Sequence, residues 1–219
     1  MANAVLERYR ALRAVSDELH SGCLQLVSQK TVRDTARAIG LLRGGTLAME
    51  YPEEVVLVRD LCVHTARPGR SRAVDRFAQA AIFAAGSDAA MVLGAMQRAR
   101  FSIWQVVGYH DDCGVIVQDT LRNCQTWLVD EALTAGCRIG EAYAARLQVA
   151  GDFVMSNGLV VPMTRALFAE FDDRITLPLQ VMEPSALAGD YRFAQALYRA
   201  AVATNAMERV QFADTPLAA

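Results

Sequence analysis

The hydrophobic pattern changes its period at about residue 101, and this change limits the possible folds more than any other feature of the sequence. In the first hundred residues, apolar positions recur every three or four residues, which is typical of amphipathic helices. From Phe101 onward the repeat shortens to two residues, which is typical of strands with one buried face. The sequence therefore predicts an α+β fold: a helical N-terminal half, then a small antiparallel β-sheet or barrel, then C-terminal helices.

The N-terminal half is predicted to form a series of short helices. Their periodic segments are 3–27, 30–42, 50–66, 70–83 and 87–98. Gly44-Gly45 interrupts the pattern after the second segment, because adjacent glycines favour turns. Pro52 is tolerated in the first turn of the third helix, and Ser87 is a suitable N-cap for the fifth. We expect these helices to make up one region, residues 1–99.

Strand-like segments follow at close intervals, separated by turns that contain Gly, Asn or Asp. The segments are 101–107, 115–119, 126–130, 141–149 and 153–161. Short strands with turns of this kind predict a small barrel or a strongly curled antiparallel sheet over residues 100–165.

The rest of the chain is predicted to be a linker and helices. A short helix is expected over 163–171, because Pro162 ends the last strand, and a longer helix over 191–207. Prolines at 178 and 184 indicate an irregular linker between the two helices. Residues 166–219 should then pack back on the rest of the molecule.

Composition and length indicate a globular protein. Of the 219 residues, 53% are hydrophobic and 21% are charged, and the apolar runs are shorter than the roughly 20 residues of a membrane-spanning helix. The formal net charge of -2 argues against a dedicated polyanion-binding protein. Five irregularly spaced cysteines give no disulfide framework, and no signal-peptide pattern follows Met1. We therefore expect a cytoplasmic protein without a membrane partner.

Arginines gather in one segment, at Arg67, Arg70, Arg72 and Arg76. Guanidinium groups on a loop before a helix can clamp a phosphate or a nucleic-acid backbone. Neither a glycine-rich phosphate loop nor an RNA-binding aromatic motif accompanies them. The expected interpretation is a solvated loop, and a small-molecule site or a weak nucleic-acid site are the alternatives.

The segment His110-Asp111-Asp112 lies in a predicted hairpin turn. A histidine beside two carboxylates can bind a metal ion or act as a general base. Asp residues are also favoured in turns for backbone reasons, and no further catalytic group can be identified from the sequence. We expect turn formation to explain this segment, with ligand binding or catalysis as the alternative.

Two pairs of potential zinc ligands occur in the helical half: His20 with Cys23, and Cys62 with His64. The residues of the second pair are two positions apart on a predicted helix, so their side chains diverge. Buried thiols and histidines that simply pack in a core are common. We expect core residues here, and neither a metal ion nor another cofactor.

Trp104 and Trp127 fall on neighbouring predicted strands, where they could line a ligand cleft. Tryptophans in a small sheet more often supply its main apolar mass or lie at a dimer contact. Short strands with an uncovered edge favour association with a second copy of the chain. The sequence thus predicts a homodimer.

Several segments resemble a known family. They are Gly86-Ser-Asp-Ala-Ala-Met-Val-Leu-Gly-Ala-Met96, Ala99-Arg-Phe-Ser-Ile-Trp104, Gly114-Val-Ile-Val-Gln-Asp119, Trp127-Leu-Val-Asp-Glu131, Ala145-Arg-Leu147 and Val160-Val-Pro162. Together they are similar to a family of alphaproteobacterial proteins of unknown function, with a helical N-terminal half and a small barrel-like segment. The likeness covers about residues 86–165 and is weaker upstream. It implies no activity, cofactor or site residue.

Three function hypotheses remain. The sequence lacks the common nucleotide-binding, metalloprotease and serine-hydrolase motifs, which favours a non-catalytic interaction or regulatory protein with an unidentified protein partner. A small-molecule-binding protein or enzyme that uses the His110 turn and the Arg67–Arg76 loop is the alternative. Weak nucleic-acid binding through the same arginines is the second alternative.

Overall fold

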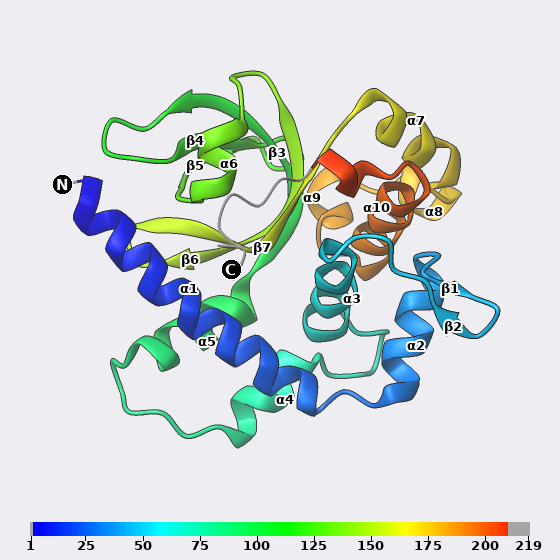
Figure 1. Ribbon diagram of the computed structural model, residues 1–219, viewed down its shortest axis with the longest axis horizontal. Coiled ribbons are helices and arrows are strands. Elements are labelled where there is room, and N and C mark those ends of the chain that lie inside the picture. Colours follow the sequence, from blue (N-terminus) through cyan, green and yellow to red (C-terminus); the bar gives the residue numbers. More distant parts are fainter. Residues whose placement is uncertain (1, 210–219) are drawn as a thin grey trace, which may run out of the picture.

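The computed structural model describes residues 2–209, as helices around a curled sheet (Figure 1). The helices of the N-terminal half are α1 (Ala2–Gln25), α2 (Gln29–Ala38), α3 (Glu53–His64), α4 (Ala73–Ala80) and α5 (Asp88–Arg98). Ser28 and Ser87 cap α2 and α5, since their hydroxyls accept hydrogen bonds from the backbone N–H of Thr31 and Ala90. At Gly44-Gly45 the chain turns between two short strands, β1 (Leu42–Arg43) and β2 (Thr46–Leu47).

The strands of the main sheet pair in a closed order. They are β3 (Arg100–Tyr109), β4 (Val115–Asp119), β5 (Cys124–Leu128), β6 (Ala142–Ala150) and β7 (Phe153–Pro162). Their order is β3-β4-β5-β7-β6, and β6 pairs back with β3. The α+β fold class and the order of its three parts are therefore confirmed.

One pairing differs from the antiparallel sheet that the sequence predicts. β5 and β7 run parallel, through the pair Leu128 and Val154, while the other pairings of the main sheet are antiparallel. A ring with an odd number of strands cannot alternate direction all the way round, so one neighbouring pair has to be parallel. The crossover between β5 and β7 runs through α6 (Glu131–Gly136) and then β6. The sequence does not predict α6.

A register shift between β6 and β7 interrupts the ladder in its middle. Ala145 pairs with Val160 and Leu147 pairs with Ser156, so that Arg146 lies opposite the three residues 157–159. Gly158 has a φ of 94°, a conformation that suits glycine because it has no Cβ. Such a shift bends the strand and interrupts, around Arg146, the regular alternation of side chains between the two faces of the sheet.

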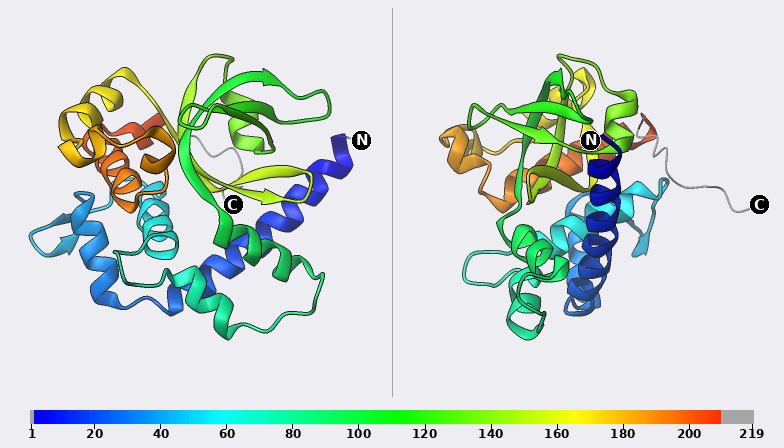
Figure 2. Two further views of the ribbon diagram at one scale, coloured as in Figure 1. Left: turned by 180° about the vertical axis from the view of Figure 1, so that it is seen from behind. Right: turned by 90° about the vertical axis from the view of Figure 1, so that its left-hand side faces the viewer.

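The C-terminal helices lie beside the sheet, on the side of α3 (Figures 1 and 2). They are α7 (Arg165–Arg174), α8 (Leu177–Gln180), α9 (Pro184–Leu187), α10 (Tyr191–Ala203) and the 3-10 turn η1 (Ala206–Arg209). Between Pro178 and Pro184, where the sequence predicts a linker, the chain runs from the single turn α8 to the single turn α9. Within residues 2–209, no helix combines the length and apolar character needed to cross a membrane.

One buried apolar cluster joins the three parts of the chain. Phe101 at the start of β3 meets Phe193 and Tyr198 of α10 edge to face, with ring centroids 5.5 and 5.3 Å apart. Leu57 of α3 and Leu159 of β7 belong to the same buried cluster. The division at residues 99 and 165 stays a prediction, and residues 210–219 of its last part lie outside the described residues.

Candidate functional site

A pocket of about 740 Å³ lies where three segments of the chain meet. The loop between α3 and α4 forms one wall, the first residues of β3 form another, and the turn that begins α10 forms a third. This volume is in the range of small-molecule binding sites. Seven arginines line the pocket, against two aspartates.

Four of these arginines are paired with aspartates. The pairs are Arg72 with Asp75 at 2.7 Å, Arg122 with Asp119 at 3.0 Å, Arg146 with Asp60 at 2.9 Å and Arg192 with Asp190 at 2.7 Å. Each aspartate neutralises its arginine and holds the guanidinium group in one orientation. These pairs therefore shape the pocket and contribute little net charge.

The other three arginines, Arg67, Arg70 and Arg100, are exposed at the pocket. Within residues 2–209 the structure records no ion pair for any of them. Positive charges that face one cavity reinforce each other, because field lines concentrate in a concave site with low-dielectric walls. The pocket is therefore positive although the chain carries a net charge of -2.

The buried Asp60 carboxylate organises the floor of the pocket. Arg146 donates to both of its oxygens, at 2.9 and 3.1 Å, and the Tyr198 hydroxyl and the Asn157 amide donate to it at 3.1 and 3.2 Å. Burial alone would raise the pKa of Asp60, but the charge of Arg146 and these hydrogen bonds hold it at about 2. Asp60 is therefore ionised at neutral pH.

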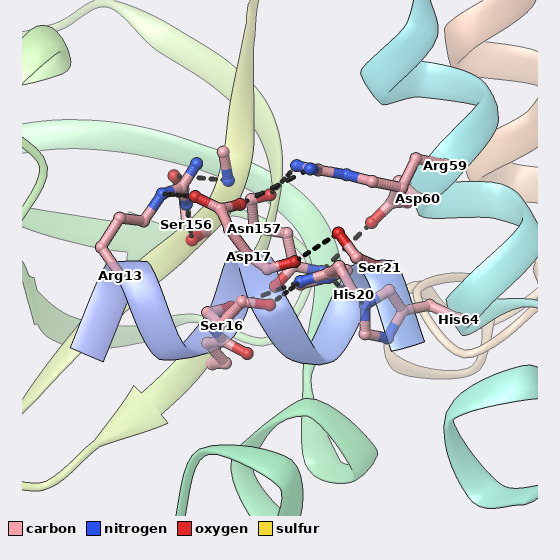
Figure 3. A network of polar contacts seen from close by, with 12 residues as sticks. Arg13, Ser16, Asp17, His20, Ser21, Arg59, Asp60, His64, Ser156 and Asn157 are labelled. Atoms are coloured by element: carbon pink, nitrogen blue, oxygen red, sulfur yellow. Dashed lines mark hydrogen bonds and ion pairs between the residues drawn. The ribbon is translucent and has the colours of Figure 1, made fainter. Parts of the chain in front are cut away.

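The register shift in β7 brings the Asn157 amide to Asp60. Two arginines secure the shifted segment from the helical side, as Figure 3 shows: Arg13 of α1 donates to the Ser156 carbonyl at 2.8 Å, and Arg59 of α3 donates to the Asn157 carbonyl at 3.1 Å. Gly158 lies under both guanidinium groups, and a side chain at this position would overlap that of Arg13. The turned backbone and its two arginines thus fix the direction of the Asn157 amide.

Two buried histidines meet beside Asn157 (Figure 3). The Nε2 atoms of His20 and His64 are 3.0 Å apart, and the Asn157 amide nitrogen is 2.9 Å from Nε2 of His64. Nδ1 of His20 is 2.7 Å from the Ser16 carbonyl, whereas Nδ1 of His64 has no hydrogen-bond partner within residues 2–209. His64 also lines the pocket, so this polar network reaches the pocket wall.

Burial keeps both imidazoles neutral at pH 7. Burial and the charge of Arg59 lower the pKa of His20 to about 4. Burial and the charge of Arg146 lower the pKa of His64 well below its usual range. The pair is therefore uncharged at neutral pH.

The structure places three residues of the predicted arginine cluster, Arg67, Arg70 and Arg72, in the pocket wall. Arg76 is outside the pocket, and its guanidinium group donates to the Ser71 carbonyl at 2.6 Å and to the Leu26 carbonyl at 3.1 Å. Arg76 therefore stabilises the loop through two backbone contacts that lie outside the pocket. A binding role for the cluster stays a prediction.

The His110 turn lies at the opposite end of β3 from the pocket. The Asp112 N–H donates to Nδ1 of His110 at 3.2 Å, and the imidazole stacks on Trp127 with ring centroids 3.8 Å apart. Neither His110 nor Asp111 nor Asp112 lines the pocket. The two segments that the sequence analysis combines in one hypothesis therefore do not form one site.

The four residues considered as zinc ligands are all buried. His20 and His64 come together, but the Cys62 thiol instead donates to the Thr35 hydroxyl at 3.5 Å. Across residues 2–209, no group of three or more His, Cys, Asp or Glu side chains is placed to hold a metal ion. The chemistry of this region is thus hydrogen bonding and charge pairing.

Sequence reasoning missed several pocket and floor residues: Arg100, Arg122, Arg146, Arg192, Asp60 and Asn157. The arginines are scattered along the chain, so only the fold brings them together. One local signal was present: Asn157-Gly158 in the middle of an apolar strand segment indicates a bulge. Arg146, inside a strand of mostly buried residues, was a second signal, since a buried charge requires a partner.

The fold and the pocket define an α+β protein with a closed five-stranded sheet and an arginine-lined cavity between its three parts. Residues 3–167 match the family of unknown function DUF7986, and because this is more than half of the chain, the protein belongs to that family. The resemblance predicted from the sequence is thereby confirmed as membership of a family of unknown function. The match ends before the pocket residues of 188–194. Comparisons with curated proteins and with solved structures give no match.

Proposed function

We propose that the protein binds a small polyanion, with phosphate, sulfate or several carboxylate groups, in the arginine-lined pocket. The observation that carries this proposal is the grouping of Arg67, Arg70 and Arg100 around a cavity of about 740 Å³, with no ion pair recorded for them among residues 2–209. Like charges held at one site repel each other, and an anion between them removes this repulsion. Guanidinium groups also bind phosphate and carboxylate oxygens through paired hydrogen bonds.

The aspartate-paired arginines favour binding by lowering its entropic cost. Arg72 is held by both oxygens of Asp75, at 2.7 and 2.8 Å, so its guanidinium group is already oriented. Arg146 is held in the same way by Asp60. A ligand that contacts these groups orders fewer side chains than one that binds to free surface arginines.

A small ligand agrees better with the charge distribution than a nucleic acid does. The positive groups face into a concave pocket, whereas the chain as a whole carries a net charge of -2. A polymer that lies across the surface would meet the negative charges as well. The proposed role is therefore that of a non-catalytic, ligand-responsive binding protein, in line with the regulatory hypothesis.

The cytoplasm is the proposed location. Cys23, Cys62, Cys113, Cys124 and Cys137 are all free thiols. Free thiols persist in reducing compartments and are oxidised in secreted proteins.

Isothermal titration with tripolyphosphate and with inositol hexasulfate tests the proposal. The wild type should bind at least one of them with a 1:1 stoichiometry, and affinity should fall as salt concentration rises. Arg70→Ala and Arg100→Ala should each weaken binding by roughly tenfold, which corresponds to about 1.4 kcal/mol for one lost charged contact.

Arg33→Ala on α2 is the matched control, because this arginine does not line the pocket. It removes the same charge from the chain and should leave the affinity almost unchanged. Equal losses in all three variants would show non-specific charge attraction and would defeat the proposal. Tighter binding of a single-stranded oligonucleotide than of either small anion would defeat it in favour of nucleic-acid binding.

A further inference from the structure

The contacts of the two buried histidines fix where protons can lie. The Ser16 carbonyl can only accept a hydrogen bond, so Nδ1 of His20, 2.7 Å away, carries a proton. Asn157 donates one amide hydrogen to Asp60 at 3.2 Å. Its second amide hydrogen faces Nε2 of His64, 2.9 Å away, and a donor at this position requires a lone pair there.

The neutral pair cannot satisfy all of these contacts at once. Each neutral imidazole has one N–H, and that of His20 is already on Nδ1. If the proton of His64 is on Nδ1, the two Nε2 atoms face each other with lone pairs at 3.0 Å. If it is on Nε2 instead, it bonds to His20 but then opposes the N–H of Asn157. One close contact is therefore unfavourable in either tautomer.

A single additional proton removes the contact between the two lone pairs. His20 then carries protons on both nitrogens and donates from Nε2 to the lone pair of His64, which the Asn157 amide also approaches. The proton of His64 is placed on Nδ1, the one nitrogen of the pair that has no partner within the described chain. His64 lines the pocket and its Nδ1 is buried without a partner within the described chain, so an anionic oxygen that reaches this nitrogen from the pocket would accept its N–H.

Burial is the main reason why the proton is absent without a ligand, since it disfavours a charged imidazole, and the nearby charges add a smaller effect. Positive groups face the pair from three sides: Arg59 on α3, Arg72 on the loop before α4 and Arg146 on β6. Two negative groups oppose them, Asp60 on α3 and Asp17 on α1, and Asp75 neutralises Arg72. The polar groups that bond to the pair are uncharged: Ser16 on α1 contacts His20, and Asn157 on β7 contacts His64. Gln148 on β6, which donates to the Ser16 hydroxyl, is uncharged as well.

An anion among the pocket arginines shifts this balance, since it lowers the positive potential at the nearby imidazoles. We propose that the pocket takes up its anion together with one proton, which the His20–His64 pair holds, and that His64 is the residue that contacts the ligand at the pocket floor. This inference rests on the proposed anion-binding function and adds a ligand-contact residue and a proton to it. Because linkage is reciprocal, acidification must then strengthen anion binding.

Inositol hexasulfate is the appropriate probe, because its sulfate groups keep their charge between pH 5.5 and 8. Titration calorimetry of the wild type at pH 6 is repeated in buffers with different heats of ionisation, and the dependence of the observed heat on the buffer gives the protons taken up. We expect an uptake that approaches one proton per anion, and an affinity that rises by up to about tenfold for each pH unit of acidification. Binding with no proton uptake and no pH dependence would overturn this inference while leaving the proposed function intact. No binding of this probe to the wild type would overturn this inference, and the proposed function would fall with it only if tripolyphosphate also failed to bind.

Two variants locate the proton. His64→Gln and His20→Gln should each abolish the proton uptake. His110→Asn changes the third histidine, at the opposite end of β3 from the pocket, and should leave the proton uptake unchanged. If either buried variant fails to fold, the wild type still gives an answer, because a chain with three histidines allows each imidazole to be assigned by ¹H–¹⁵N NMR. The probe should convert His20 from one N–H to two and place the proton of His64 on Nδ1. An unchanged spectrum of both rings in the saturated complex would contradict the inference.

Discussion

The ion pair between Asp60 and Arg146 should be a main determinant of stability, and Asp60→Asn tests this directly. Both side chains are almost fully buried, at 2% and 7% exposure, and the carboxylate accepts four hydrogen bonds. The amide of Asn leaves Arg146 as a buried charge without a counter-ion and replaces one acceptor oxygen by a donor. Removing one partner of a buried pair typically costs about 3–5 kcal/mol.

Urea unfolding followed by circular dichroism measures this loss. With an m value of about 2–3 kcal/mol/M, the midpoint should fall by about 1–2 M urea while the slope stays the same. Asp34→Asn, which removes an exposed carboxylate that pairs with Lys30 and Arg37, is the control and should leave the midpoint almost unchanged. The double variant Asp60→Leu/Arg146→Met removes both charges and should recover much of the loss. A midpoint for Asp60→Asn within error of the wild type would refute the reasoning.

Four further predictions concern other parts of the molecule. Stability should decrease as pH falls from 6.5 toward 4, because His20 binds a proton in this range in the unfolded chain but not in the folded chain, where its pKa is about 4. His20→Gln should flatten this part of a pH–stability curve. Trp104→Ala, at a side chain only 6% exposed, should lower the free energy of unfolding by about 3–5 kcal/mol, measured by thermal or chemical unfolding. Trp127→Ala should lower it less, because Trp127 is only half-buried, and the reverse order would contradict the packing. Gly158→Ala should destabilise by about 1–3 kcal/mol, clearly more than Gly151→Ala, which has the same positive φ but open space around it. Light scattering should show the proposed homodimer, and a monomer at high concentration would exclude it.

The local pattern was sufficient to predict most of the fold. Strands were expected over 115–119 and 153–161 and lie at Val115–Asp119 and Phe153–Pro162, because alternation of apolar residues and Gly or Asn turns determine strand boundaries locally. The parallel pairing of β5 and β7 could not be predicted in this way. It follows from closure of the sheet, which depends on contacts between strands far apart in the sequence.

The candidate site was predictable only in part. Arg67, Arg70 and Arg72 are close in the sequence, so the cluster was visible, but its partner Arg100 is separated from it by two helices. The net charge pointed away from an anion site, because a sum over the whole chain does not show how charges are arranged in space. The meeting of His20 with His64 depends on the packing of α1 against α3, which periodicity does not specify.

The position of α10 after α3 and the sheet in the sequence has a consequence for how the protein is made. A ribosome releases the N-terminal residues first, so α3 and the whole sheet are synthesised before α10. Until α10 arrives, Phe101 lacks its two aromatic neighbours and Asp60 lacks the hydroxyl of Tyr198. The nascent chain therefore carries an uncovered apolar face and an unfinished pocket until α10 has been synthesised. The ability to bind an anion would then mark a chain in which α10 has packed against α3 and the sheet.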